Sequence, residues 1–332
     1  MYVPFDIMQT EFSRVFQKAG LSAEKAEVCA RIHTETSRDG VSSHGANRVI
    51  RFVDYLKKAW VAPDAEPTLH KQFGALEVWD GNLGPGILNA LHCTDRAMAL
   101  AKQYGIGLVG LRNTTHWMRG GSYGLYAAEH GYALIAWTNT ESRMPPWGGK
   151  EARLGTNPFV VALPSEEEPL LLDMAMSQYS YGKLETLRLA GEVLPYPGGF
   201  DTEGHLTVDP GAIEESVRPL PIGYWKGSAF AFFLDLLAAV FSDGAGAVTL
   251  DALGKGGSGC SQVFLAIDPN KLSTAEHMEE LKALAKAHIK SATPTGEGEI
   301  RIPGASVAIA RRKAQAQGVW IDDGTWAKIC AY

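Results

Sequence analysis

Apolar residues follow helical spacing in the first third of the chain. A helix is predicted over 22–39, because Ser22 is a suitable N-cap and Gly40 ends the pattern. A second helix is predicted to begin near His44 and to continue to about residue 56, with its apolar residues on one side. A short strand at 75–80 and a third helix at 88–104 complete this part of the chain.

The pattern then changes to short apolar runs rich in branched residues and bounded by Gly, Pro and Asn, which indicate strands. These runs are 106–112, 132–139, 159–164, 170–175 and 260–268. Helical stretches are predicted at 122–131, 180–191, 274–291 and 306–317, and 191–220 is expected to be an exposed excursion. The fold class is therefore α/β or α+β, with a large mixed sheet covered by helices. The alternation is too irregular for a doubly wound sheet.

The most apolar segment, 228–241, is expected to be a buried core helix. It is too short to cross a bilayer and carries Asp235 in its middle, so no membrane association is expected. The N-terminus shows no basic region followed by an apolar stretch, and the four cysteines have no paired spacing. Reduced thiols and a cytoplasmic location are the expectation.

Composition narrows the class of partner. The chain has 332 residues, 45% of them hydrophobic and 20% charged, so it can bury a large core without disulfides or structural metals. Its formal net charge is −6, and its Lys and Arg residues are dispersed, which argues against a nucleic-acid surface. Small molecules and a second copy of the chain are the expected partners.

Two strings match the glycine pattern of dinucleotide-binding folds, and neither has the context that the pattern requires. Gly105–Gly110 follows a helix and opens a strand, the reverse of the strand–turn–helix order. Gly254–Gly259 is predicted to lie between two strands and to form a mobile hairpin loop. Any dinucleotide must therefore bind by another arrangement.

The segment 40–48, GVSSHGANR, is the most informative for chemistry. His44 and Arg48 are four residues apart and would share one face of the helix predicted there. Histidine can donate a proton near neutral pH, and the guanidinium of arginine can bind a carboxylate through two hydrogen bonds. The alternative is a helix N-terminus capped by Ser43, with an exposed arginine.

Three further segments combine polar residues with strand ends or helix starts. His116 lies in a polar segment between a strand and a helix, where ligand sites of α/β proteins form, although a connecting loop is an equal alternative. Lys226 precedes the apolar helix and could bind a pyrophosphate, or simply be solvated. Asp173 could accept a hydrogen bond from a ribose or cap a turn.

A hydrolase or metal-dependent enzyme is a weaker interpretation. Ser43 and His44 are adjacent and lack the G-x-S-x-G elbow of many hydrolases, and no metal-ligand spacing of His and Cys occurs. A lyase or hydrolase that binds a metal through His44, His92 and His116 is the alternative from this class.

Six segments in order resemble the type-2 malate/L-lactate dehydrogenase family of NAD(P)-dependent oxidoreductases, which lack a Rossmann fold. They are GVSSHGANR (40–48), RNTTHWMRGGSYG (112–124), GTNP (155–158), LLLDMAMS (170–177), PIGYWKGSAF (221–230) and IRIPG (300–304). The resemblance implies a layered fold in one oxidoreductase unit, 1–332. Its parts would be a helical part with the catalytic histidine (1–70), a mixed-sheet, cofactor-binding part (71–300) and C-terminal helices that pack back (301–332). It also implies a homodimer with the site near the subunit interface.

The resemblance further implies roles for individual residues. His44 matches the family's proton donor, with Ser43 and Arg48 beside it, and His116 and Asn157 match positions that line the same cleft. The implied cofactor contacts are Pro169, Leu170, Leu171, Leu172, Asp173, Met174, Ala175, Trp225, Lys226, Gly304, Ala305 and Ser306. One departure concerns the acidic residue that the family usually has soon after the late Pro-Gly, because this chain reads Ala305-Ser306 there.

The activity implied is reduction of a small 2-oxo acid to the 2-hydroxy acid, with NADH preferred to NADPH and without a bound metal. The family's substrates leave open malate, lactate, ureidoglycolate, sulfolactate or a cyclic imino acid. A non-catalytic ligand-binding protein on this fold is the alternative from another class; the pair of His44 and Arg48 argues against it, and the missing acidic residue keeps it open.

Overall fold

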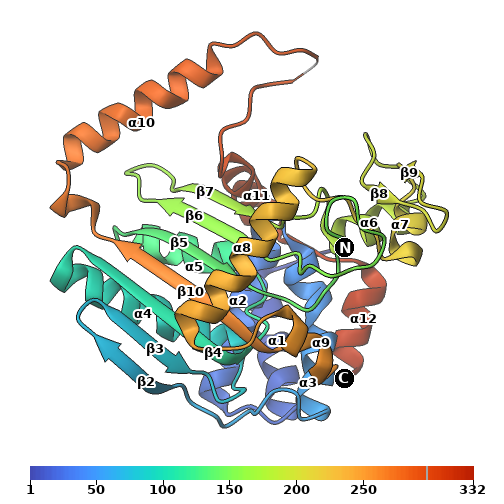
Figure 1. The fold of residues 1–332 in the computed structure, drawn as a ribbon, viewed down its shortest axis with the longest axis horizontal. Coiled ribbons are helices and arrows are strands. Elements are labelled where there is room, and N and C mark those ends of the chain that lie inside the picture. The colour runs from blue at the N-terminus through green and yellow to red at the C-terminus, as the bar shows by residue number, and fades with distance from the viewer. Residues whose placement is uncertain (297) are drawn as a thin grey trace.

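The computed structural model describes residues 1–296 and 298–332. Seven strands form a mixed sheet in the order β2-β3-β4-β10-β5-β6-β7 (Figure 1). They are β2 (Thr68–Phe73), β3 (Leu76–Asp80), β4 (Ile106–Thr115), β5 (Ala133–Thr138), β6 (Phe159–Leu163), β7 (Leu170–Met174) and β10 (Ser258–Ile267). The pair β3 and β4 is parallel, and the other neighbours are antiparallel. The expected large mixed sheet is confirmed.

Helices cover both faces of this sheet. On one face, α4 (Gly86–Tyr104) and α5 (Gly120–Glu129) share a buried cluster with Phe264 of β10. On the other face, α8 (Trp225–Ser242) shares a cluster with Val263, the preceding residue of the same strand. Successive residues of a strand point to opposite faces, so a strand buried on both faces needs a continuous apolar sequence.

The glycine string 105–110 has a packing role in this arrangement. A Cβ at Gly107 would lie 2.3 Å from the carbonyl oxygen of Ala97 on α4, and a Cβ at Gly110 would lie 2.1 Å from that of Phe241 on α8. The two glycines therefore allow the backbones of helices on opposite faces to approach β4 closely. This explains the string without a dinucleotide.

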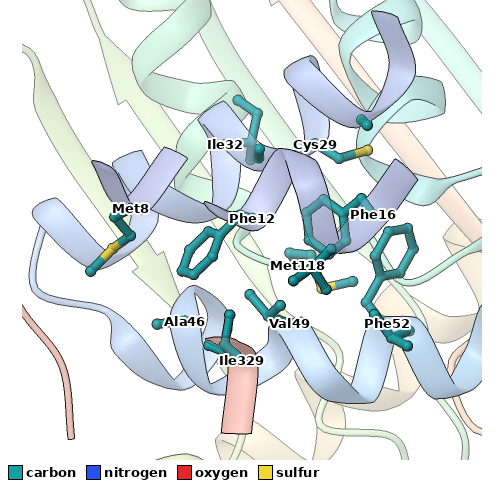
Figure 2. Close-up of a cluster of buried hydrophobic side chains, with 14 of the residues drawn as sticks. Met8, Phe12, Phe16, Cys29, Ile32, Ala46, Val49, Phe52, Met118 and Ile329 are labelled. Carbon is teal, nitrogen blue, oxygen red and sulfur yellow. The ribbon is translucent and has the colours of Figure 1, made fainter. Parts of the chain in front are cut away.

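The two ends of the chain pack together. The helices α1 (Phe5–Lys18), α2 (Ala23–Arg38), α3 (Val49–Lys57) and α12 (Asp323–Ala331) surround one apolar core, and β1 (Tyr2–Val3) pairs with β11 (Val319–Trp320). Figure 2 shows Phe12, Phe16 and Phe52 in this core, together with Ile329 from α12 and Met118 from the loop after β4. Met118 connects the helical part to the sheet. The division at residues 70 and 300 stays a prediction.

The remaining elements lie around this body. The 191–220 excursion contains β8 (Gly199–Phe200), β9 (Leu206–Thr207) and α7 (Pro210–Ser216), and it packs with α6 (Tyr181–Ala190) around its own small core. The other helices are α9 (Ala247–Leu253), α10 (Ala275–Lys290), α11 (Ala305–Gln317) and the 3-10 turns η1 (Ser42–His44), η2 (Ala46–Arg48) and η3 (Pro269–Lys271). Helix α10 projects away from the body (Figure 1), and none of its residues is buried.

The predicted start of the second helix, near His44, is wrong. The 3-10 turns η1 and η2 precede α3, which begins at Val49. Gly45 interrupts the helical path with φ −103° and ψ −114°, and its carbonyl oxygen lies 3.0 Å from Nδ1 of the buried His33. A Cβ at Gly45 would lie 2.2 Å from Oγ of Ser37, so this close approach requires glycine. His44 and Arg48 are therefore not placed by one α-helix.

Two further expectations need correction. The 228–241 segment lies in a longer helix, α8, which buries Ala231, Leu234 and Ala238 against the sheet but exposes its other side. By length and composition this helix could span a membrane; here it covers the sheet, and Asp235 accepts a hydrogen bond from Asn139 at 2.9 Å. The 254–259 loop follows a helix, α9, rather than a strand.

Candidate active site

A cavity of about 1000 Å³ lies between the helical part and the sheet. Its walls come from segments far apart in the sequence, including η1, the loop after β4, β7, the 254–257 loop and the start of α11. Among its lining residues are ten that the sequence predicts for the site, namely Ser43, His44, Arg48, His116, Leu171, Asp173, Met174, Ala175, Gly304 and Ser306. The fold thus brings together segments from both ends of the chain.

His44 is the last residue of η1, and its imidazole faces this cavity. Its Nδ1 lies 3.1 Å from the hydroxyl oxygen of Ser43, and its ring stacks on that of His116 with centroids 5.9 Å apart. In the described part of the chain, no protein group hydrogen-bonds its Nε2, which leaves this nitrogen for a ligand. The contact with Ser43 fixes the orientation of the ring.

Burial and nearby positive charges disfavour the protonated form of His44. Burial, followed by the positive charges of Arg48 and Arg119, lowers the pKa of His44 to about 3. The imidazole is therefore neutral at neutral pH while the cavity holds no anion. A bound carboxylate would offset part of this positive charge and favour the imidazolium form.

Two guanidinium groups give the cavity its anion-binding character. Arg48 donates from Nε to the carbonyl oxygen of Ser43 at 3.1 Å, and Arg51 follows one turn later. Among residues 1–296 and 298–332, neither arginine has a carboxylate within 4 Å. Their charge is available to an anionic ligand, and the planar guanidinium of Arg48 suits a carboxylate.

His116 presents a hydrogen-bond donor to the cavity. The backbone N–H of Met118 donates to Nδ1 of His116 at 2.9 Å, so Nδ1 is an acceptor and the neutral ring carries its proton on Nε2. Burial, followed by the charge of Arg48, holds the pKa of His116 well below its usual range. The backbone N–H of His116 donates to Gly257 at 2.7 Å and joins this loop to the 254–257 loop.

Asp173, at the end of β7, brings a carboxylate to another part of the wall. It accepts a hydrogen bond from the backbone N–H of Gly121 at 2.9 Å and lies 3.6 Å from Nε of Arg119. Burial raises the pKa of Asp173, and the Arg119 charge and the Gly121 N–H oppose this effect. Its second oxygen is available to a hydroxyl group.

The start of α11 lies against β7, the strand that carries Asp173. Gly304 precedes the helix with φ +92°, and a Cβ there would lie 2.9 Å from the carbonyl oxygen of Pro169. This close approach places the N-terminus of α11 and Ser306 beside β7. A helix N-terminus and a hydroxyl suit phosphate groups, and a carboxylate suits a ribose diol, so these residues fit a nicotinamide dinucleotide.

Several predicted site residues lie outside the cavity walls. Trp225 and Lys226 are exposed at the start of α8, and Pro169, Leu170, Leu172 and Ala305 are neighbours of lining residues. Asn157 is fully buried behind the wall, where its side chain accepts from the Thr140 N–H at 3.0 Å and donates to the carbonyl of Ala231 at 2.8 Å. Both ends of this amide are therefore used by protein, and the contact of Asn157 with substrate stays a prediction.

Other lining residues were not predicted from the sequence. They are Arg51, Tyr55 and Trp60 from α3 and its end, Arg119 before α5, Glu141 and Arg143 after β5, and Tyr181 and Glu185 of α6. Arg51 lies three residues after Arg48 and Tyr55 one turn further on, so helical spacing was a usable signal for both. Glu141 and Arg143 lie in a loop without a recognisable pattern.

The metal-binding alternative needs three ligands in one place. His92 lies on α4, where its ring packs against Trp79 with centroids 4.3 Å apart, and it is not a lining residue of the cavity that holds His44 and His116. Within the described residues, no group of three His, Cys, Asp or Glu side chains is arranged to hold a metal ion. The four cysteines are free, and Cys330 is the exposed one among them.

Comparisons with known proteins agree with this arrangement. The malate/L-lactate dehydrogenase family model matches residues 3–330. The chain is 44% identical to 2,3-diketo-L-gulonate reductase of Escherichia coli and 45% identical to that of Citrobacter koseri, each over 333 aligned positions and 100% of both chains.

Solved structures show the same fold. Malate dehydrogenase from Pyrococcus horikoshii is 27% identical, with a TM-score of 0.90 over 99% of this chain and 93% of that one. Sulfolactate dehydrogenase from Methanocaldococcus jannaschii is 27% identical, with a TM-score of 0.87 over 100% and 97%. The chain therefore belongs to the malate/L-lactate dehydrogenase family and is a nicotinamide-dependent oxidoreductase that acts on a small 2-oxo acid or its 2-hydroxy acid.

Proposed function

We propose that this enzyme uses NADH to reduce 2,3-diketo-L-gulonate, or a closely related 2-oxo acid, to the 2-hydroxy acid, with His44 as the proton donor. The observation that carries the proposal is the cavity that His44, Arg48 and Asp173 all line. Their side chains are suited to donate a proton, to bind an anion and to bind a ribose, respectively. The full-length similarity to 2,3-diketo-L-gulonate reductases supports the choice of substrate.

Each residue has a separate task in this mechanism. Arg48 binds the substrate carboxylate, and this anion offsets part of the positive charge that, after burial, lowers the pKa of His44. NADH, when bound, supplies the hydride to the 2-oxo carbon. His44 donates the proton from Nε2 to the carbonyl oxygen as its negative charge develops, while Ser43 holds Nδ1 and the ring orientation. Positioned acid catalysis of this kind contributes roughly 10²–10⁴-fold in rate.

The residues for the cofactor support NADH over NADPH. Asp173 accepts a hydrogen bond from a ribose hydroxyl and would repel a 2′-phosphate at the same place. Gly304 and Ser306, at the start of α11, hold the phosphates, with Leu171, Met174 and Ala175 along the ring systems. Ser306 carries no charge, so this chain lacks the additional repulsion that an acidic residue would supply. Trp225 and Lys226 stay predicted contacts.

We further propose that the enzyme is a cytoplasmic homodimer. Along α8, large apolar side chains face solvent, with Val240 70% exposed and Phe233 57% exposed. An apolar helix face of this size is typical of a protein interface. A second copy of the chain on this face would also bury Trp225 and Lys226, which lie at the start of the same helix.

Loss of absorbance at 340 nm tests the proposed reaction. NADH, and separately NADPH, would be supplied with 2,3-diketo-L-gulonate, pyruvate, oxaloacetate, sulfopyruvate and a cyclic imino acid, with His44→Ala beside the native enzyme. Fast oxidation of NADH with diketogulonate, lowered at least a hundredfold in the variant, is the expected result. A loss below tenfold would remove His44 from its role. A folded native protein without turnover on any acid would favour the ligand-binding alternative.

A further inference from the structure

Near the 254–257 loop, the cavity wall carries one carboxylate, one guanidinium and one phenol. Glu141 and Arg143, from the loop after β5, line this region with Tyr55 of α3. The chain of contacts to the reaction centre is short, since Gly257 accepts a hydrogen bond from the N–H of His116, and its own N–H lies 3.3 Å from Oε2 of Glu141. Glu141 is therefore one loop residue away from the imidazole that stacks on His44.

The carboxylate of Glu141 is held in place by groups of the protein. Oε2 accepts the Gly257 N–H, and Oε1 lies 3.3 Å from Nη2 of Arg143. The side chain is 25% exposed, so it still faces the cavity. The preceding residue, Thr140, is fixed by the hydrogen bond of its N–H to the buried Asn157. This hydrogen bond supports the loop that carries Glu141.

Gly256 leaves an open space between Glu141 and Tyr55. A Cβ at this position would lie 3.6 Å from Oε1 of Glu141 and 3.8 Å from the hydroxyl oxygen of Tyr55, with nothing else within 4 Å. Both polar atoms therefore border the same gap. Trp60, whose ring centroid is 5.4 Å from that of Tyr55, adds an aromatic surface to this wall.

We propose that Glu141 is a specificity-determining residue that selects 2-oxo acids with a neutral, hydroxylated tail over 2-oxo diacids. This inference rests on the proposed function, in which Arg48 binds the carboxylate of the substrate and His44 faces its 2-oxo group. The tail then extends along the 254–257 loop to the gap between Glu141 and Tyr55.

The chemistry of Glu141, Arg143 and Tyr55 favours hydroxyl groups on the tail of the substrate. A hydroxyl is both donor and acceptor, so a diol can donate to the Glu141 carboxylate and accept from the Arg143 guanidinium or the Tyr55 phenol. A second carboxylate would meet the negative charge of Glu141 at short range. An ammonium group would meet the positive charge of Arg143, which lies 3.3 Å from the Glu141 carboxylate. The neutral tail is therefore the best match.

The test compares kcat/KM for 2,3-diketo-L-gulonate, pyruvate and oxaloacetate in four variants, with competitive inhibition by L-gulonate and L-malate as a second measurement. We expect Glu141→Ala to lower kcat/KM for diketogulonate roughly 10- to 100-fold, because hydrogen bonds to a charged group are lost, and to change pyruvate less than threefold. Glu141→Gln keeps hydrogen bonding without charge, so it should raise kcat/KM for oxaloacetate relative to kcat/KM for pyruvate. In both variants L-gulonate should inhibit less well relative to L-malate.

Two further variants complete the test, the second of them as a control. Gly256→Ala fills the gap without requiring a left-handed backbone, so it should lower diketogulonate turnover more than pyruvate turnover. Glu151→Gln removes an exposed carboxylate that does not line the cavity, and it should change neither. Specific loss in the first variant without loss in the second supports a tail in this gap.

Several results would overturn the inference. An unchanged preference among the three acids in Glu141→Ala would do so, as would a native preference for a 2-oxo acid with a cationic tail. Turnover of pyruvate or oxaloacetate but not diketogulonate, abolished by His44→Ala, would leave the mechanism in place and contradict the role of Glu141. Absence of turnover with every acid would instead contradict the proposed function itself.

Discussion

The carboxylate of Asp39 forms an ion pair with Arg119 at 2.8 Å, and the two side chains are 2% and 3% exposed. Arg311 of α11 contacts the same carboxylate at 2.8 Å and 3.2 Å, and Arg38 contacts it at 3.0 Å. Asp39 thus connects the end of α2 to the start of α5 and to α11. Because Arg119 also approaches Asp173, this buried charge cluster is part of the wall proposed to bind the cofactor.

Asp39→Asn should destabilise the protein strongly. It removes the nearer charge partner of the buried Arg119 guanidinium and leaves only Asp173, at 3.6 Å. Breaking a buried ion pair from one side costs about 3–5 kcal/mol. The free energy of unfolding, measured by urea denaturation, checks this value. Glu168→Gln is the matched control, because its pair with Arg312 is 53% and 67% exposed and should contribute less than about 1 kcal/mol. Equal losses in the two variants would contradict the structural role of Asp39.

Asp39 also predicts how stability depends on acid. Burial raises its pKa, but the hydrogen bond from Arg311 and the charge of Arg119 outweigh burial, so the net pKa is lowered. A carboxyl group with a lowered folded-state pKa contributes stability above its unfolded pKa of about 3.9 and loses it as the pH falls through the folded pKa. The difference in unfolding free energy between native protein and Asp39→Asn should therefore be constant from pH 7 to 5 and should shrink below pH 4. A difference that grows in acid would contradict this assignment.

Much of this fold could be predicted from local pattern. Helix 22–39 with its Ser22 cap is confirmed, because capping and apolar spacing depend on neighbouring residues. The predicted start of α3 was wrong because the conformation of Gly45 depends on contacts with His33 and Ser37, which belong to another helix. The face of α8 was misjudged for a similar reason, since composition cannot tell a helix buried by its own chain from one left exposed.

The site was predictable where the sequence carries a motif. Ser43, His44, Arg48 and Asp173 were named from their segments, and the structure places them in one cavity. Asn157 was named from the same resemblance, but its hydrogen bonds with Thr140 and Ala231 join segments far apart in the sequence and could not be predicted from it. The loop residues that face the substrate follow no periodic pattern, so the geometry of the cavity was needed to find them.

The low pKa of His44 predicts different pH profiles for reduction and for oxidation. Reduction requires protonated His44, whose pKa in the free enzyme is about 3, so kcat/KM for reduction should fall about tenfold per pH unit above pH 4. Oxidation of the 2-hydroxy acid requires neutral His44 and should lose nothing from this group between pH 8 and 5. Stopped-flow measurement of both directions checks the prediction. Parallel profiles would show that another group transfers the proton.

Asp173→Asn should weaken cofactor binding more than it affects the chemical step. The variant replaces a charged acceptor by a neutral one, so NADH affinity should fall roughly tenfold while kcat at saturating NADH changes little. The affinity for NADPH should fall less, because repulsion of its 2′-phosphate disappears together with the carboxylate. Fluorescence titration with each nucleotide measures both constants. Leu163→Ala, a change at an exposed residue of the neighbouring strand β6 that does not line the cavity, is the control and should leave both affinities unchanged.

The exposed face of α8 predicts a test of the oligomeric state. Val240→Glu and Phe233→Asp place a charge on side chains that are 70% and 57% exposed in the single chain, so neither should disturb folding of that chain. If a second copy covers this face, burial of an unpaired charge would be costly and both variants should become monomers. Light scattering after size-exclusion chromatography should show twice the chain mass for native protein and half of that value for the variants. Leu189→Glu, 72% exposed on α6, should stay dimeric. Dimers that persist in both α8 variants would place the interface on another surface.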